Sequence, residues 1–69
     1  MKKISVLIAN RHATSITLEP EFIEALKEIA TQKKQSLNQI ITEIDKNRQV
    51  RNLSSAIRVY VLENIKKVN

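Results

Sequence analysis

The sequence contains no cysteine and no glycine among its 69 residues, and only one proline. Without cysteine, neither a disulfide framework nor a thiolate zinc site can stabilise the fold. A chain this short buries only about 60% of the surface that its unfolded form exposes, so it is marginally stable as a monomer. We therefore expect a single domain over residues 1–69 that gains stability by forming a homodimer, or a larger assembly on its ligand.

Long hydrophobic runs are also missing. The opening "MKKISVLIA" resembles the start of a secretory signal, but its apolar run is too short and Arg11 and His12 follow it directly. No other apolar stretch approaches the roughly 20 residues that span a bilayer. We expect a cytoplasmic protein with no membrane partner.

The residues that usually carry catalysis are sparse. Without glycine the chain has no phosphate-cradling loop, and its one histidine, His12, has no cysteine or clustered carboxylates near it in the sequence. Glu43 and Asp45 lie two positions apart in a helical pattern, so they point in different directions and cannot act as an acid–base pair. We expect no enzyme, no catalytic residue, no metal site and no cofactor.

The charge is positive and unevenly distributed. Twelve lysines and arginines face seven acidic residues, for a formal net charge of +5. This balance indicates a polyanionic partner, nucleic acid before membrane. Residues 1–18 contain Lys2, Lys3 and Arg11 but no acid, whereas four glutamates gather just beyond, at Glu19, Glu21, Glu24 and Glu28. A basic side opposite an acidic side is the polarity that a DNA-binding face requires.

Three helices are predicted from their start signals. Pro20 favours the first turn of a helix and moves the preceding residue out of helical geometry, which predicts a helix over 20–33. Ser36 and Gln39 form a capping-box pattern before an apolar stripe, which predicts a helix over 37–47. Asn52 or Ser54 can cap a third helix over about 53–67, whose wide apolar face suggests two neighbours, one of them from another chain.

A short strand is predicted at 13–18, where apolar and hydroxyl residues alternate. Residues 4–9 alternate with the same parity. The two runs can form a folded-back pair, or one bent strand with a mobile arm, and the sequence leaves both open. Because a lone strand cannot satisfy its own backbone groups, the strand at 13–18 must pair, and in a dimer the obvious partner is the same strand of the second chain.

That pairing would form an antiparallel ribbon across a two-fold axis. One face carries Thr14, Ile16 and Leu18 and packs on the helices, while Ser15 and Thr17 project from the other. A two-stranded ribbon fits the major groove of DNA, where serine and threonine can contact base edges or thymine methyl groups.

The segment "TSITLEPEFIEALKEIATQKKQSLNQIITEI" resembles the ribbon-helix-helix family of bacterial DNA-binding proteins, which includes the Arc and methionine repressors. The similarity covers about residues 13–44. It narrows to short chains with an HxTS ribbon followed by a C-terminal NLSSA helix, written here as "HATSITLE" and "NLSSAIR". The resemblance implies a mainly α fold with one short β-strand, an intertwined homodimer with an intermolecular ribbon, and an extra C-terminal helix.

The resemblance also implies a DNA-binding site. The groove-facing positions of the family fall on Ala13, Ser15 and Thr17. Its phosphate anchor is the turn before the second helix with that helix's N-terminus, where free N–H groups and the helix dipole attract phosphate. These positions are Lys34, Gln35, Ser36, Leu37 and Asn38. The implied dimer core contains Ile16, Leu18, Phe22, Leu26, Ile29, Leu37, Ile40, Ile41, Ile44, Ile57, Tyr60 and Val61.

Ala13 departs from the family, which often has arginine or another long polar residue there. Alanine cannot donate a hydrogen bond to a base, so base recognition is poorer or has moved to Arg11. The preferred function is a homodimeric transcriptional regulator, a repressor, that binds double-stranded DNA. The alternatives are an antitoxin-like module whose C-terminal helix binds a protein partner, and a dimerisation module that has lost DNA binding.

Overall fold

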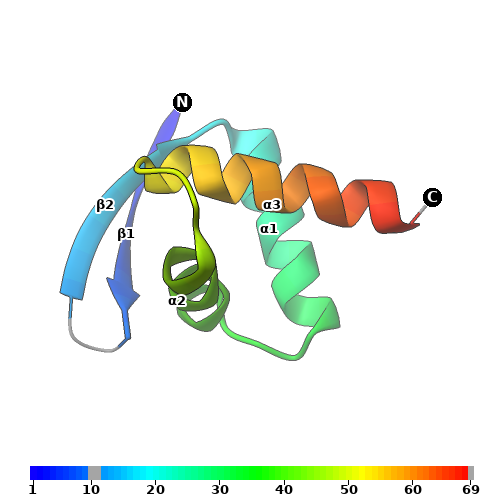
Figure 1. Cartoon of the computed structure of the whole chain (residues 1–69), viewed down its shortest axis with the longest axis horizontal. Coiled ribbons are helices and arrows are strands. Elements are labelled where there is room, and N and C mark those ends of the chain that lie inside the picture. The colour runs from blue at the N-terminus through cyan, green and yellow to red at the C-terminus, as the bar shows by residue number, and fades with distance from the viewer. Residues whose placement is uncertain (10–11, 69) are drawn as a thin grey trace.

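The computed structural model describes residues 1–9 and 12–68, and the side chains of residues 67 and 68 are outside that description. A β-hairpin comes first, formed by β1 (Lys2–Ile8) and β2 (His12–Leu18). Three helices follow: α1 (Pro20–Gln32), α2 (Leu37–Asn47) and α3 (Leu53–Val68). Figure 1 shows the hairpin on one side of the molecule, with α2 beside it and α3 running across α1. The chain is therefore mainly α with an extra C-terminal helix, as predicted, and its strands form a β-hairpin.

The hairpin resolves the two alternatives for the N-terminus. β1 pairs antiparallel with β2, from Lys2 opposite Leu18 to Ile8 opposite His12, so the N-terminal run is a folded-back strand. Ala9 begins the turn with a left-handed φ of 54°. The strand at 13–18 was expected to take its partner from a second chain, but one of its edges is paired within its own chain. Pairing with a second chain stays a prediction for the other edge of β2.

The core lies between the inward face of the hairpin and the three helices. Leu18, Leu26, Ile40, Ile41 and Ile57 are fully buried there. Within the described residues the buried set contains no polar or charged side chain. The remaining buried residues are Val6, Ile16, Ile23, Ile29, Ala30, Ile44, Ala56 and Val61.

One residue of the predicted core stripe was misplaced. The predicted core included Phe22 and omitted Ile23, but Ile23 is 3% exposed and Phe22 is only half-buried against the core. Ile23 lies three residues before Leu26, so it shares the inward face of α1. Leu37 and Tyr60 are likewise half-buried at the core's edge.

The ends of the helices follow from local chemistry. Pro20 is the first residue of α1, and Glu19 before it is extended, with φ −62° and ψ 141°. Ser36 and Gln39 form the reciprocal capping box at the start of α2. Asn52 caps α3, because its Oδ1 accepts a hydrogen bond from the Ser55 amide at 3.1 Å. The described helices include none that is long and apolar enough to cross a membrane.

The two sequence motifs, HATSITLE and NLSSAIR, meet in space. Arg58 of α3 donates its Nε–H to Oε1 of Glu19 at 2.9 Å, across 39 positions of sequence. A hydrogen bond from its own backbone amide, followed by the bond from Arg58, lowers the pKa of the Glu19 carboxyl from its ordinary value of 4.5. The ion pair joins α3 to the corner where β2 turns into α1.

Candidate nucleic-acid interface

The outward side of β2 carries the three predicted base-contacting positions. Ala13, Ser15 and Thr17 alternate with the inward Thr14, Ile16 and Leu18, and all three are exposed. Arg11, the fourth predicted contact, lies outside the described residues. The structure therefore brings the three described positions together on one face.

β1 adds three residues to that face which sequence reasoning did not assign to it. The register sets Lys3 opposite Thr17, Ser5 opposite Ser15, and Leu7 opposite Ala13, and all three β1 residues are exposed. We call the six residues the hairpin face: Lys3, Ser5, Leu7, Ala13, Ser15 and Thr17. The signal was present in the sequence, because Lys3, Ser5 and Leu7 alternate with the apolar Ile4, Val6 and Ile8. The hairpin face contains one cation, hydroxyls and two apolar residues, and no acid.

The two edges of the hairpin differ. On the β1 edge, the Leu7 amide donates to Asn38 Oδ1 at 3.1 Å and the Ala9 amide donates to Thr42 Oγ1 at 2.9 Å, so α2 holds β1. Since the Leu7 amide points away from β2, Leu7 and Ala13 form a non-hydrogen-bonded pair. The alternation of the antiparallel ladder then directs the backbone groups of Ala13, Ser15 and Thr17 toward the opposite, unpaired edge of β2.

A groove runs beside that unpaired edge. It has a volume of about 460 Å³ and is lined by residues 14–17 of β2, by residues 52–54 at the start of α3, by Arg58 and by Met1. The lining is mixed, with polar residues such as Ser15, Thr17 and Asn52 beside the apolar Met1, Ile16 and Leu53. An open strand edge with unpaired backbone groups is a template for pairing with another strand.

The turn between α1 and α2 contains the predicted phosphate anchor, residues 34–38, which we call the anchor turn. α1 ends in a Schellman-type arrangement, in which the Gln35 amide donates to Ala30 O at 2.9 Å and the Lys34 amide donates to Thr31 O at 3.1 Å. Lys34 has a left-handed φ of 58°, at the position where glycine is usual. Its side chain is exposed.

The N-terminus of α2 offers a small set of uncommitted donors. The Ser36 hydroxyl accepts from the Gln39 amide at 3.1 Å, and Gln39 Oε1 accepts from the Ser36 amide at 2.7 Å. The amides of Leu37 and Asn38 have no acceptor within the described part of the chain, as expected for the first helical residues. These two amides, the Ser36 hydroxyl hydrogen and the Lys34 ammonium together could bind an anion at the positive end of the α2 dipole.

Two of the predicted anchor residues are also occupied within the fold. Gln35 donates its amide to α1 and its side-chain Nε2 to Glu43 Oε2 at 3.1 Å, so it has no uncommitted backbone donor. Asn38 uses its side-chain oxygen to hold the Leu7 amide, which leaves its own Nδ2 hydrogens to donate. The anchor turn therefore stabilises the fold as well as presenting hydrogen-bond donors.

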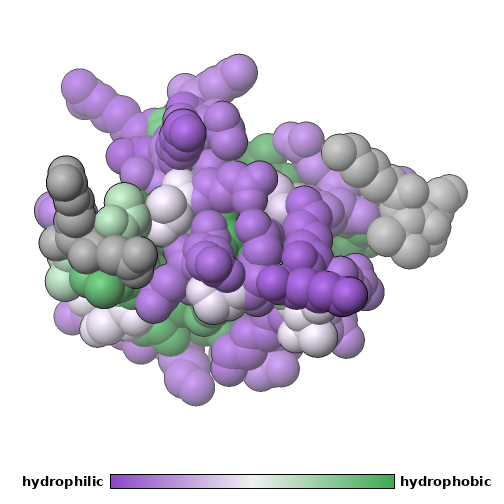
Figure 2. All heavy atoms as spheres, turned by 90° about the horizontal axis from the view of Figure 1, so that it is seen from below, coloured by the Kyte–Doolittle hydropathy of each residue, from purple (hydrophilic) through white to green (hydrophobic). Residues whose placement is uncertain are grey.

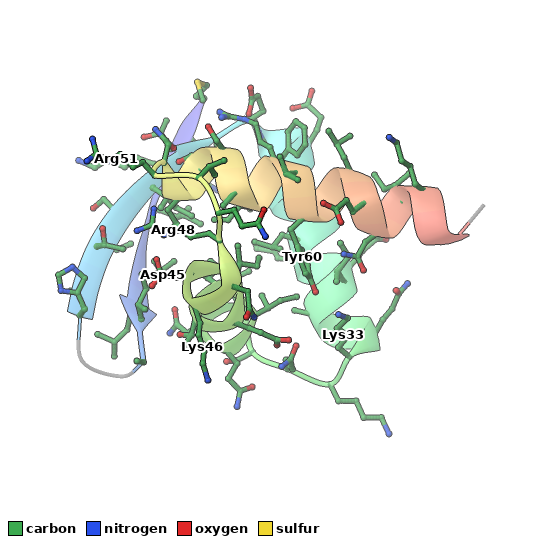
Figure 3. All side chains as sticks on the ribbon, viewed as in Figure 1. Lys33, Asp45, Lys46, Arg48, Arg51 and Tyr60 are labelled. Carbon is green, nitrogen blue, oxygen red and sulfur yellow. The ribbon has the colours of Figure 1, made fainter. Side chains whose placement is uncertain are left out.

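Other basic residues are engaged within the chain, both Lys33 next to the anchor turn and Arg48 at the opposite end of α2 (Figure 3). Lys33 donates to Tyr60 Oη at 2.7 Å, and its ammonium lies 5.2 Å from the centre of the Tyr60 ring. That hydrogen bond raises the pKa of Lys33. Arg48 pairs with Asp45 at 3.0 Å and donates to the Arg51 carbonyl, which fixes the connector between α2 and α3. Among the described residues, the Lys34 side chain makes no hydrogen bond or ion pair, which distinguishes it from Lys33.

The molecular surface is largely hydrophilic on the side of the anchor turn (Figure 2). Figure 2 views the molecule from below relative to Figure 1, and hydrophilic side chains cover most of that side. Apolar surface is visible toward the left, near the turn of the hairpin. The side of the anchor turn is therefore largely polar, as contact with a hydrated polyanion requires.

Comparison with known proteins gives one family. The family described as "Ribbon-helix-helix domain" matches residues 1–65, which include the hairpin, α1, α2 and most of α3. Neither the curated proteins nor the solved structures include a significant match to the chain. Because the match covers almost the whole sequence, the chain belongs to the ribbon-helix-helix family, a family of DNA-binding transcription regulators.

Proposed function

We propose that the protein is a homodimer that binds specific double-stranded DNA sequences and regulates transcription, as a repressor, in the bacterial cytoplasm. The single observation that carries this proposal is the exposed hairpin face, which the hydrogen bond from the Leu7 amide to Asn38 Oδ1 joins to the anchor turn. Exposed hydroxyls on a two-stranded ribbon suit base edges in the major groove, and uncommitted amides at a helix N-terminus suit the flanking phosphates.

The dimer forms, in this proposal, through the unpaired edge of β2. Antiparallel pairing about a two-fold axis at Ser15 sets Ser15 opposite its own copy and Thr17 opposite Ala13 of the second chain. The two β2 strands then form the central ribbon, flanked on each side by β1. The predicted dimer-core residues are buried or half-buried within one chain, and dimerisation would extend that core across the interface.

The base contacts are assigned to Ser15 and Thr17, with Ala13 limited to apolar contact and Arg11 as a further candidate. The phosphate contacts are assigned to Lys34, to the Ser36 hydroxyl and to the amides of Leu37 and Asn38. Gln35 is the fifth predicted phosphate contact. This division separates sequence recognition on the ribbon from sequence-independent affinity at the anchor turn.

The proposal is tested by selecting bound fragments from random duplex DNA and by measuring mass and salt dependence on the selected sequence. We expect a dimer at micromolar concentration, and an affinity that falls steeply with salt because each neutralised phosphate contributes about 0.9 to the log–log slope. A folded monomer, or a chain that binds no duplex at low salt, would refute the proposal.

A second candidate function rests on α3. Val59, Leu62 and Ile65 of α3 are about half exposed, at 48%, 49% and 49%. An apolar surface of this kind favours a protein partner, as in an antitoxin-like module. Replacing Val59 and Ile65 with lysine distinguishes the cases. If the dimer covers this surface, the variant should become monomeric; if it stays a DNA-binding dimer, the surface is free for another protein.

A further inference from the structure

We infer that β1 is a second DNA-contacting strand, and that Lys3 binds the phosphate backbone at the rim of the major groove. This inference rests on the proposed function, since it assumes that the paired β2 strands enter the groove. It assigns a role to a strand that sequence reasoning left as an arm or an extra element.

The width of the proposed four-stranded sheet supports a contact between β1 and DNA. Four adjacent strands, β1 and β2 with their copies, place the two outer strands about 14 Å apart, because neighbouring strands lie about 4.8 Å apart. The major groove is about 12 Å wide. The central β2 strands fit inside the groove, and the β1 strands lie over its walls, where the phosphates are.

The register of β1 against β2 also supports this contact. Lys3 lies directly opposite Thr17 on the hairpin face, and both are exposed. In the proposed dimer, a row across the sheet reads Lys3, Thr17, then Ala13 and Leu7 of the second chain. The lysine is at the outer end of the row, over the groove wall, and the hydroxyl is inside the groove.

The chemistry of the row supports the assignment. Lysine is a flexible point charge that suits a phosphate oxygen and carries no fixed base preference. Within the described residues, the side chain of Lys3 makes no hydrogen bond or ion pair with the rest of the protein, whereas Lys33 is held by Tyr60. In this row Thr17 separates Lys3 from Ala13 of the second chain, which cannot donate a hydrogen bond to a base, so the row gains affinity from a phosphate contact at its outer end.

Lys2 provides a matched control on the same strand. It is exposed like Lys3 and carries the same charge, but its partner is Leu18, and its position alternates toward the opposite side of the sheet. A direct contact predicts different effects for the two lysines. A long-range field from the basic N-terminus predicts equal effects.

The experiment compares Lys3→Gln with Lys2→Gln and Lys34→Gln in DNA binding over a range of salt concentrations. Two Lys3 contacts per dimer should make the log–log slope shallower by about 1.8, with a loss of affinity on the order of tenfold at 0.1 M salt for all duplex sequences. Lys2→Gln should leave the slope within measurement error of the wild type.

The outcomes separate the inference from the proposed function. If Lys34→Gln lowers the slope and Lys3→Gln does not, β1 lies off the DNA while the proposed function stands. Equal effects of Lys2→Gln and Lys3→Gln would also overturn the contact. If the wild-type protein binds no duplex, both the function and the inference fail.

Discussion

The hairpin face and the anchor turn, the two surfaces assigned to DNA, differ in what else their residues do. The side chains of Lys3, Ser15 and Thr17 are exposed, with no hydrogen bond to the protein among the described residues. In the anchor turn, by contrast, Ser36 caps α2 and Asn38 holds the backbone of β1. A change on the hairpin face should therefore alter binding alone, whereas a change in the anchor turn should alter binding and folding together.

The largest expected effect is on sequence preference, at Thr17. Thr17→Val removes the hydroxyl but keeps the branched shape that suits a strand. Each lost base contact should reduce discrimination between the selected and a random duplex by roughly 1–3 kcal/mol. The free energy of unfolding should change by less than about 0.5 kcal/mol, because the side chain is exposed.

The control for this change is Thr17→Ser, which keeps the hydroxyl and removes the methyl group. The affinity of both variants for the selected duplex and for the random duplex is measured, and their thermal unfolding is measured in parallel. A loss of affinity that is equal on the two duplexes would mean that Thr17 contacts the backbone, and that the base-reading surface lies elsewhere.

The next effect is at Ser36, where binding and folding are coupled. Ser36→Ala removes the side-chain acceptor of the Gln39 amide, which should lower the free energy of unfolding by about 1 kcal/mol. It should also weaken binding to every duplex, because the α2 N-terminus is less well fixed and the hydroxyl donor is gone.

Ser36→Asp separates the two roles. Aspartate caps as well as serine and suits the helix dipole, so the fold should keep its stability. Its negative charge should repel a phosphate at the same point, so affinity for DNA should fall at low salt. If Ser36→Asp binds duplex DNA as well as the wild type does, no phosphate lies at the start of α2.

Lys34 should give effects of opposite sign on stability and binding. Its left-handed backbone, at φ 58°, costs a side-chain-bearing residue about 1 kcal/mol or more relative to glycine. Lys34→Gly should therefore raise the free energy of unfolding, by up to about 1 kcal/mol because the greater freedom of glycine in the unfolded chain offsets part of the gain, while the loss of two phosphate contacts per dimer lowers the salt slope by about 1.8.

Lys34→Gln is the matched variant, since it removes the charge and keeps the left-handed residue. It should lower the salt slope as Lys34→Gly does, without the gain in stability. Equal stabilities of the two variants in urea unfolding would contradict the cost assigned to the left-handed backbone.

Local signals in the sequence were sufficient to predict the helices. Pro20 determines the corner before α1, and the Ser36–Gln39 capping box determines the start of α2. Both act through backbone groups within a few residues, so they operate before any tertiary contact forms. The alternation on β2 likewise identified its outward side, because strand side chains have a period of two.

Long-range pairings were beyond this reasoning. The fold-back of β1 places Leu7 against Asn38, 31 positions away, and neither glycine nor proline marks the bend. The ion pair between Arg58 and Glu19 joins the NLSSAIR and HATSITLE motifs. The presence of both motifs in the sequence did not indicate that they lie close together in space. Phe22 was preferred to Ile23 because size and hydrophobicity do not determine which of two adjacent residues faces inward; the packing of α1 does.

The smallest expected effect is that of pH, through the pair of Glu19 with Arg58. This pair joins the β2–α1 corner to α3, so it contributes to folding and contacts neither DNA surface directly. Because folding lowers the pKa of the Glu19 carboxyl below 4.5, the folded state releases this proton more readily than the unfolded state. The contribution to stability is present above about pH 4.5 and is lost as the pH falls through the lower folded-state pKa.

Glu19→Gln tests that contribution without disturbing the helix start, since Glu19 makes no side-chain capping bond. Glutamine keeps an oxygen to accept from Arg58 and removes only the charge. The wild type should be more stable than the variant at pH 7, and urea unfolding should show the difference shrinking below pH 4.5. The difference should be small, because the Glu19 side chain is 41% exposed and water screens the pair. Arg58→Met should reduce this pH dependence without abolishing it, because the hydrogen bond from the Glu19 backbone amide also lowers the carboxyl pKa and remains, and adding Arg58→Met to Glu19→Gln should leave no further pH-dependent loss. If the difference in the free energy of unfolding between the wild type and Glu19→Gln persists unchanged to pH 3, the effect comes from shape or packing at the β2–α1 corner. The charge of Glu19 would then not contribute to holding α3.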